Sequence, residues 1–134
     1  MKLNHVTILV SDFERSKAFY RGLGLTQIVE AAPRYARFTF PDGDATLSIE
    51  VKDGATAGGS AELFFECGDV DATVGALAAK GIGFYQEPTD MFYLWREARL
   101  RDPDGHELRF YRDATGARLD PPWKLQQEAA PAPA

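Results

Sequence analysis

The chain has 134 residues, which suits one domain, and its 45% hydrophobic and 26% charged residues are typical of a soluble globular protein. Its formal net charge of −5 argues against nucleic acid or an anionic membrane as the main partner. No apolar run approaches the roughly 20 residues that span a bilayer. The single cysteine, Cys67, excludes an intrachain disulfide and a thiolate zinc cluster. We therefore expect one cytoplasmic domain, with no nucleic-acid or membrane partner.

An internal repeat organises most of the chain. When residues 5–25 are laid on the segment that starts at residue 62, Asp12 falls on Asp69 and Gly24 on Gly81, each at a spacing of 57 residues. The Pro-Asp-Gly sequence at 41–43 recurs at 103–105, at a spacing of 62. Matches at one spacing, followed by a further match beyond an insertion, indicate a duplication. We expect about five extra residues in the second copy, in the loop around residues 89–92.

The first copy begins with a strand, because Val6, Ile8 and Val10 alternate with more polar neighbours. Ser11 and Glu14 have the spacing of a capping box, which predicts the start of a helix. The apolar face of this helix is predicted to contain Phe13, Ala18, Phe19 and Leu23. Strands are then expected at about 25–31, 34–40 and 45–52.

The second copy repeats this order after a linker over residues 53–60. A strand is predicted at 61–67, a helix at about 70–80, and further strands near 82–86, 93–100 and 106–111. The two modules, 1–52 and 61–112, form a single domain over 1–112. Residues 113–134 are a C-terminal extension whose end we expect to be disordered, with Leu119 and Trp123 as candidates for docking on the body or on a second subunit.

Alternation along the strands predicts which side chains face away from the helices. Leu47, Ile49 and Val51 are expected to pack against the helices, which leaves Glu50 on the opposite side. The same rule places His5 with Glu50, and in the second copy it places Glu62 with Arg109. Two such polar faces that curve toward each other would line a cup. Phe64, Glu66, Glu107 and Tyr111 share this side.

Three segments carry a family resemblance: HVTILVSDFERSKAFYRGLGL, PDGDATLSIEV and LRDPDGHELRFY. In this order, and over roughly residues 3–112, the chain resembles the vicinal oxygen chelate superfamily. This group includes glyoxalase, extradiol dioxygenases, fosfomycin-resistance enzymes and bleomycin-binding proteins. The resemblance implies an α+β fold of two tandem βαβββ modules whose mixed sheets form an open cup that holds a metal and a substrate.

The resemblance also implies metal ligands on the first and last strand of each module. The corresponding positions are His5, Glu50, Glu62 and Arg109. An arginine cannot ligate a metal, so the implied ligands are His5, Glu50 and Glu62, which could hold Zn, Mn, Ni or Fe in an open site; without such a metal no cofactor is expected. Extradiol dioxygenase activity is not expected, because it needs two histidines and His106 is predicted at a turn or on the surface. Arg109 either neutralises Glu50 or Glu62, or clamps an anionic substrate.

The leading functional hypothesis is a glyoxalase-like lyase, or a dioxygenase-related enzyme, that acts on a small oxygenated substrate. Glu66, Glu107 and Tyr111 are candidates for proton transfer, and His5 is a possible general base. Phe92, Tyr93 and Trp95 are candidates for an apolar wall over the ligand, and Phe64 is a further candidate for binding it. The alternative is a metal-free binding protein of the bleomycin-resistance type. A homodimer with exchanged modules is possible, and Arg34, Arg37, Arg96, Arg99 and Arg101 are expected to be solvated.

Overall fold

The computed structural model describes residues 1–52 and 58–125, and within them the two predicted modules are present. Module one consists of β1 (His5–Leu9), α1 (Phe13–Gly22), β2 (Thr26–Ala31), β3 (Tyr35–Thr39) and β4 (Thr46–Glu50). Module two consists of β5 (Glu62–Glu66), α2 (Val70–Ala79), β6 (Gln86–Asp90), β7 (Arg96–Arg101) and β8 (Glu107–Arg112). The predicted α+β class with tandem βαβββ modules is confirmed.

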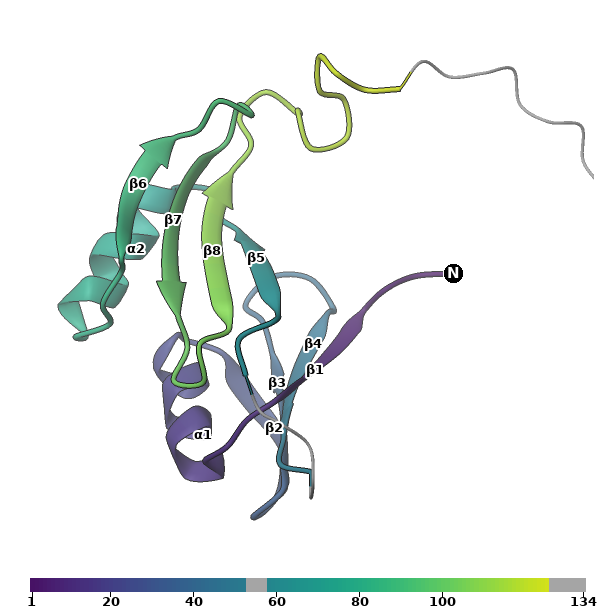
Figure 1. Ribbon diagram of the computed structural model, residues 1–134, viewed down its shortest axis with the longest axis vertical. Helices are drawn as coiled ribbons and strands as arrows, with labels where there is room; N and C mark the ends of the chain where they lie inside the picture. The colour runs from purple at the N-terminus through teal and green to yellow at the C-terminus, as the bar shows by residue number, and fades with distance from the viewer. Residues whose placement is uncertain (53–57, 126–134) are drawn as a thin grey trace, which may run out of the picture.

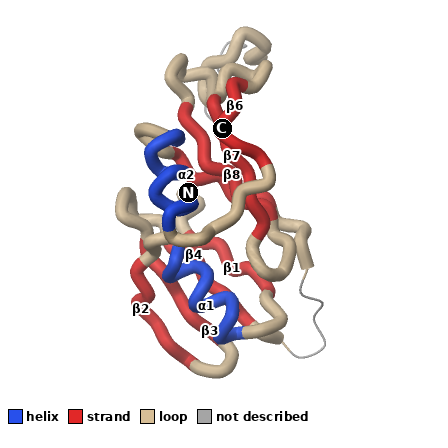
Figure 2. The backbone as a smooth tube through the Cα atoms, turned by 90° about the vertical axis from the view of Figure 1, so that its left-hand side faces the viewer, coloured by secondary structure: helices blue, strands red, loops and turns tan. Residues whose placement is uncertain are grey.

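Each module folds into a four-stranded mixed sheet. The strand orders are β1-β4-β3-β2 and β5-β8-β7-β6, and the first strand of each module runs parallel to the last. The modules follow one another along the long axis of the molecule (Figure 1). Both helices lie in front of the strands in Figure 2, so α1 and α2 cover the same side of the two sheets. We call the opposite, helix-free side of each sheet its polar face.

The second copy is longer mainly because more chain precedes β6. Three residues separate α1 from β2, whereas six separate α2 from β6. The hairpin between β6 and β7 is longer than its counterpart by only two residues, five against three. The predicted strand at 82–86 was therefore placed too early, and the expected insertion at 89–92 accounts for the smaller part of the difference. Apolar residues there, Ile82 and Phe84, pack against the core without joining a sheet.

The helix α1 begins one residue later than the capping box predicted. Asp12 is its N-cap and accepts a hydrogen bond from the backbone N–H of Arg15, at 3.0 Å. Ser11 instead donates to Asp104, with 2.6 Å between Oγ and Oδ1. The buried face of the helix contains Ser16 and Tyr20 as well as Phe13, and Ala18 is exposed. The prediction missed Ser16 and Tyr20 because both carry polar groups.

These polar groups join the two modules. Tyr20 is fully buried, and its hydroxyl donates to Asp102 Oδ2 at 2.6 Å. His106, expected at a turn or on the surface, lies beside the turn but is only 3% exposed. Its Nε2 is 2.9 Å from the carbonyl oxygen of Leu9, and the backbone N–H of Ala61 donates to its Nδ1 at 3.4 Å. The turn between β7 and β8 is thus attached to module one by hydrogen bonds.

The remaining predictions concern the ends and the linker. None of the described helices is long and apolar enough to cross a membrane. Most of the predicted linker, and the chain end that was expected to be disordered, lie outside the described residues. Leu119 and Trp123 are described and are 69% and 58% exposed, so neither is docked on the body of the single chain. Cys67 is half-buried, and burial raises the pKa of its thiol, which fits a packing residue.

Candidate functional site

The polar face of module one centres on His5. Its Nδ1 is 2.6 Å from Thr46 Oγ1, and its Nε2 is 3.2 Å from Thr7 Oγ1 and 3.3 Å from Ser48 Oγ. The parallel pairing of β1 with β4 produces this cluster, because His5 pairs with Thr46 and Thr7 pairs with Ser48. Both imidazole nitrogens therefore lie within hydrogen-bond distance of hydroxyl groups.

The three predicted metal ligands are not brought together in the single chain. Glu50 lies four residues beyond Thr46, the partner of His5, which is about 13 Å along the strand at roughly 3.3 Å per residue. Glu50 forms an ion pair with Lys52, with 3.8 Å between Oε2 and Nζ. Glu62 belongs to the other module and lies 3.7 Å from Arg109. In the described part of the chain, no group of three or more His, Cys, Asp or Glu residues is placed to hold a metal ion. The arrangement of the described residues therefore does not fit a metal site within one chain.

Strand pairing also changes the correspondence between the modules. Ser48 pairs with Thr7, and Arg109 pairs with Phe64, which is the counterpart of Thr7. The position that corresponds to Arg109 in module one is therefore Ser48, and not Glu50 as the sequence comparison assumed. The alternation of side chains correctly placed Ser48 and Glu50 on the same face. It could not specify which of the two corresponds to Arg109, because that depends on the strand register.

Arg109 is the centre of charge on the polar face of module two. Its guanidinium donates to Glu107 Oε2 from both Nε and Nη2, at 3.0 and 2.7 Å. Glu97 lies 3.6 Å away and Glu62 3.7 Å away. The arginine carbon Cζ also lies over the ring of Phe64, 5.2 Å from its centre. Arg109 is thus already surrounded by carboxylates, as the neutralisation alternative expects for Glu62.

Glu97 is a central residue of this face that the sequence analysis missed. Its exposed fraction is 0%, and it accepts hydrogen bonds from the Tyr93 hydroxyl at 2.5 Å and from Arg99 Nε at 2.7 Å. Arg99 was expected to be solvated, and this contact corrects that expectation. Burial, together with the hydrogen bond to Glu97, raises the pKa of Tyr93. Alternation with the inward-facing Ala98 would have placed Glu97 on the polar face, but it would not have predicted its burial.

An aromatic cluster occupies the same face. Trp95 stacks on Tyr111, with ring centres 4.4 Å apart and planes at 26°. Phe64 meets both rings edge-on, at 5.9 and 6.0 Å, and Tyr93 meets Trp95 at 5.7 Å. The Nε1 of Trp95 is buried and has no hydrogen-bond partner among the described residues. We call Phe64, Tyr93, Trp95 and Tyr111 the aromatic cluster. Phe92, which was also predicted in the apolar wall, is 87% exposed and contacts the cluster at Tyr93.

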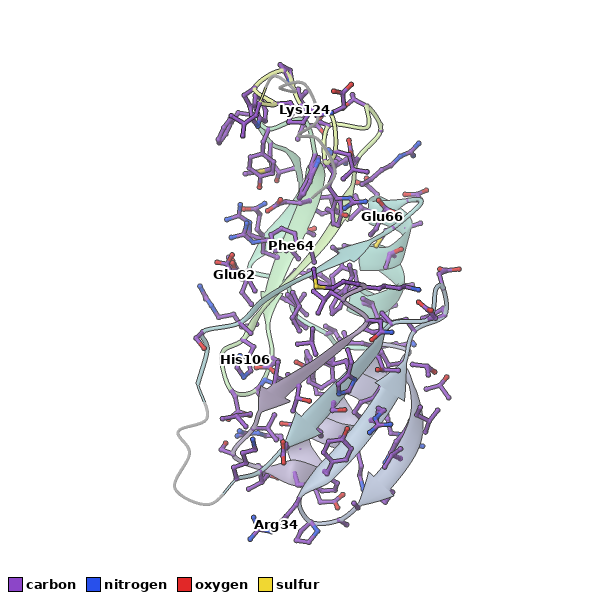
Figure 3. All side chains as sticks on the ribbon, turned by 90° about the vertical axis from the view of Figure 1, so that its right-hand side faces the viewer. Arg34, Glu62, Phe64, Glu66, His106 and Lys124 are labelled. Carbon is purple, nitrogen blue, oxygen red and sulfur yellow. The ribbon has the colours of Figure 1, made fainter. Side chains whose placement is uncertain are left out.

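The candidates for proton transfer share a face without forming one group. Glu66 pairs with Tyr111 at one end of β5 and β8, and Glu107 pairs with Glu62 at the other end. In Figure 3, Glu62, Phe64 and Glu66 follow one another along β5. Glu107 is engaged with Arg109 and also accepts from the Tyr85 hydroxyl. Burial raises the pKa of Tyr111. About 13 Å of strand separates Glu107 from Tyr111, which is too far for both to contact one reacting group of a small molecule.

Two surface hollows lie away from these groups. One, of about 660 Å³, follows the edge between α1 and β2 along residues 24–30. The other, of about 420 Å³, lies between residues 11–14 and residues 33–34. Neither of these two hollows is lined by the aromatic cluster, by Arg109 or by His5.

The architecture and these faces define a class of small α+β proteins built from two duplicated βαβββ modules. One family, described as the glyoxalase/bleomycin resistance protein/dioxygenase superfamily, matches residues 2–110. The chain belongs to this superfamily, and the resemblance seen in the sequence is confirmed. A search of the curated proteins finds no match.

Solved structures agree on the fold. A glyoxalase/bleomycin resistance protein/dioxygenase from Nocardioides is 21% identical, with a TM-score of 0.72 over 87% of this chain and 85% of that one. A family enzyme from Burkholderia phytofirmans is 22% identical, with a TM-score of 0.69 over 84% and 99%. TioX from a Micromonospora species is 20% identical, with a TM-score of 0.68 over 84% and 99%. At these identities the likeness concerns the fold alone.

Proposed function

We propose that the protein is a metal-independent binding protein that holds a small planar organic molecule against the aromatic cluster of module two. The observation that carries this proposal is the stacked Trp95–Tyr111 pair with Phe64 edge-on, on a sheet face that neither α1 nor α2 covers. Phe64 is 41% exposed, so part of the cluster is open to a ligand. Aromatic faces favour planar ligands through stacking and burial of apolar area.

The polar groups around the cluster support the same ligand class. The unpartnered Nε1 of Trp95 could donate to a ligand acceptor after a small shift of neighbouring side chains, which would remove the cost of a buried unpaired donor. Arg109 holds Phe64 from one side through its guanidinium plane and is itself neutralised by Glu107. We therefore expect the ligand to be neutral or weakly polar, and we do not expect Arg109 to act as an anion clamp.

Fluorescence of Trp95 tests the proposal directly, because Trp123 is the only other tryptophan. In a Trp123→Phe background, planar ligands should change the emission saturably. Phe64→Ala should weaken the binding of any such ligand about tenfold or more, since a buried aromatic contact contributes roughly 1.5 kcal/mol or more. Phe92→Ala, which removes an exposed neighbouring ring, is the matched control. Equal losses in both variants would contradict the proposal.

The glyoxalase-like enzyme is the competing candidate, favoured by the exposed position of His5 on the first strand. In that case His5, Glu50 and Glu62 would have to meet in an assembly of two chains, such as the expected homodimer, with Glu66, Glu107 or Tyr111 moving protons. Metal analysis of protein purified without chelators separates the two candidates. The binding protein should contain no stoichiometric Zn, Mn, Ni or Fe, whereas the enzyme should contain a metal that His5→Ala loses.

A further inference from the structure

The polar faces of the two modules each have an arginine at the same strand position, but the two arginines have different neighbours. Arg37 pairs with Ser48 in module one, and Arg99 pairs with Arg109 in module two, so Arg37 and Arg99 occupy equivalent positions. In the same registers Tyr35 pairs with Glu50 in module one, and Glu97 pairs with Tyr111 in module two. Tyr35 is therefore the counterpart of Glu97. In module two the arginine therefore has a buried carboxylate beside it, and in module one a neutral phenol takes that place.

Arg37 is nevertheless held in a defined position. Its Nε donates to the Tyr35 hydroxyl at 3.0 Å, and its Cζ lies 5.5 Å from the centre of the same ring. The Tyr35 oxygen is 2.5 Å from Oγ of Ser48, which is fully buried and also contacts His5. Hydrogen bonds that connect the buried Ser48 to Tyr35, and Tyr35 to Arg37, thus fix one edge of the guanidinium.

The other edge of the guanidinium has no carboxylate partner within residues 1–52 and 58–125. Among the residues that the structure describes, no ion pair joins Arg37 to an acidic side chain, whereas Arg99 and Arg109 each have at least one. Glu50 shares the polar face, but its ion pair is with Lys52. The two NH₂ groups of a guanidinium form a fork that matches the geometry of a carboxylate or phosphate.

We propose that the polar face of module one is an oxyanion-binding site, in which the free edge of Arg37 binds a carboxylate or phosphate group of a small molecule. Tyr35 positions the guanidinium, and the hydroxyl of Thr7 and the ring of His5 lie on the same face near the buried Ser48. The absence of a counterpart to Glu97 leaves one positive charge that a ligand can neutralise. This site is separate from the aromatic cluster and does not rest on the function proposed for it.

Two-dimensional NMR of arginine Nε–Hε groups and backbone amides tests this site at constant ionic strength. Inorganic phosphate and acetate are the two probes, and their relative affinities show which oxyanion the site prefers. We expect a saturable shift at the Arg37 Nε–Hε group and at residues 35–37. Arg37→Gln should weaken binding about tenfold or more, because charge-assisted hydrogen bonds are lost. Arg37→Lys should also weaken it, because the charge remains but the fork does not.

Two further variants separate the site from general charge effects. Tyr35→Phe should weaken binding while the spectrum of the folded protein is retained. Arg21→Gln, which removes an exposed arginine on α1, should leave binding unchanged. The proposal is overturned if the shifts do not saturate, if Arg37→Gln binds as the native chain does, or if Arg37→Gln converts a dimer into a monomer in sedimentation. In the last case the anion would be a carboxylate of a second copy. None of these outcomes alters ligand binding detected through Trp95.

Discussion

Glu97 is a carboxylate without any exposed surface, and three side chains compensate for the loss of its hydration. The Tyr93 hydroxyl and Arg99 Nε each donate to it, and Arg109 lies 3.6 Å away. A buried charge is tolerated only when it is both paired and hydrogen-bonded, so these partners belong together energetically. They come from β7, β8 and the hairpin before β7, and together they fix the relative positions of these segments on the polar face.

Replacement of Glu97 should therefore destabilise the protein. Glu97→Ala leaves Arg99 and Arg109 with less neutralisation in a mostly buried setting, and the free energy of unfolding should fall by about 3 kcal/mol. Urea unfolding followed by circular dichroism measures this change. Asp71→Ala, which breaks the exposed ion pair with Arg96, is the control and should cost much less because solvent screens that pair. A loss as small as that of the control would show that Glu97 is not held as described.

At the scale of the elements, α1 shows why polar residues can lie on a buried helix face. Ser16 and Tyr20 follow Phe13 at helical spacing, and their hydroxyls meet Asp104 and Asp102 of the other module. Hydrophobic periodicity predicted the helix and its approximate ends. It could not predict the role of Ser16 and Tyr20, because the carboxylates that accept their hydrogen bonds lie more than 80 residues away in the chain.

Tyr20→Phe should lower the free energy of unfolding at pH 7 by about 1–2 kcal/mol, since it leaves the buried Asp102 Oδ2 without this donor. The pH dependence gives a second readout. Burial, and then the negative charge of Asp102, raise the pKa of Tyr20 above its usual value of about 10. The unfolded chain therefore loses this proton first, and stability falls as the pH rises above about 10. The fall should be smaller in Tyr20→Phe, and a fall as steep as that of the native chain would contradict this role of Tyr20.

At the scale of the whole molecule, duplication made the fold predictable and the site only partly so. Strand alternation, helix periodicity and the repeated Pro-Asp-Gly turn are local signals, and both modules follow from them. The equivalence of Ser48 with Arg109 depends on the parallel pairing of the first and last strand of each module, which is set across about 40 residues. Alternation put His5 and Glu50 on one face of module one, but only the register of β1 with β4 showed that about 13 Å of strand separates them.

The joint between the modules predicts that they unfold together. Residues of both helices and both sheets form one core cluster, and His106 and Tyr20 add hydrogen bonds across the joint. Domains with a shared core usually unfold in a single cooperative transition. In a Trp123→Phe background, urea unfolding followed by Trp95 fluorescence reports on module two, and far-ultraviolet circular dichroism reports on both modules. The two curves should coincide. His106→Ala should shift both to lower urea concentration by the same amount, whereas a separation of the curves would show that each module has its own stability.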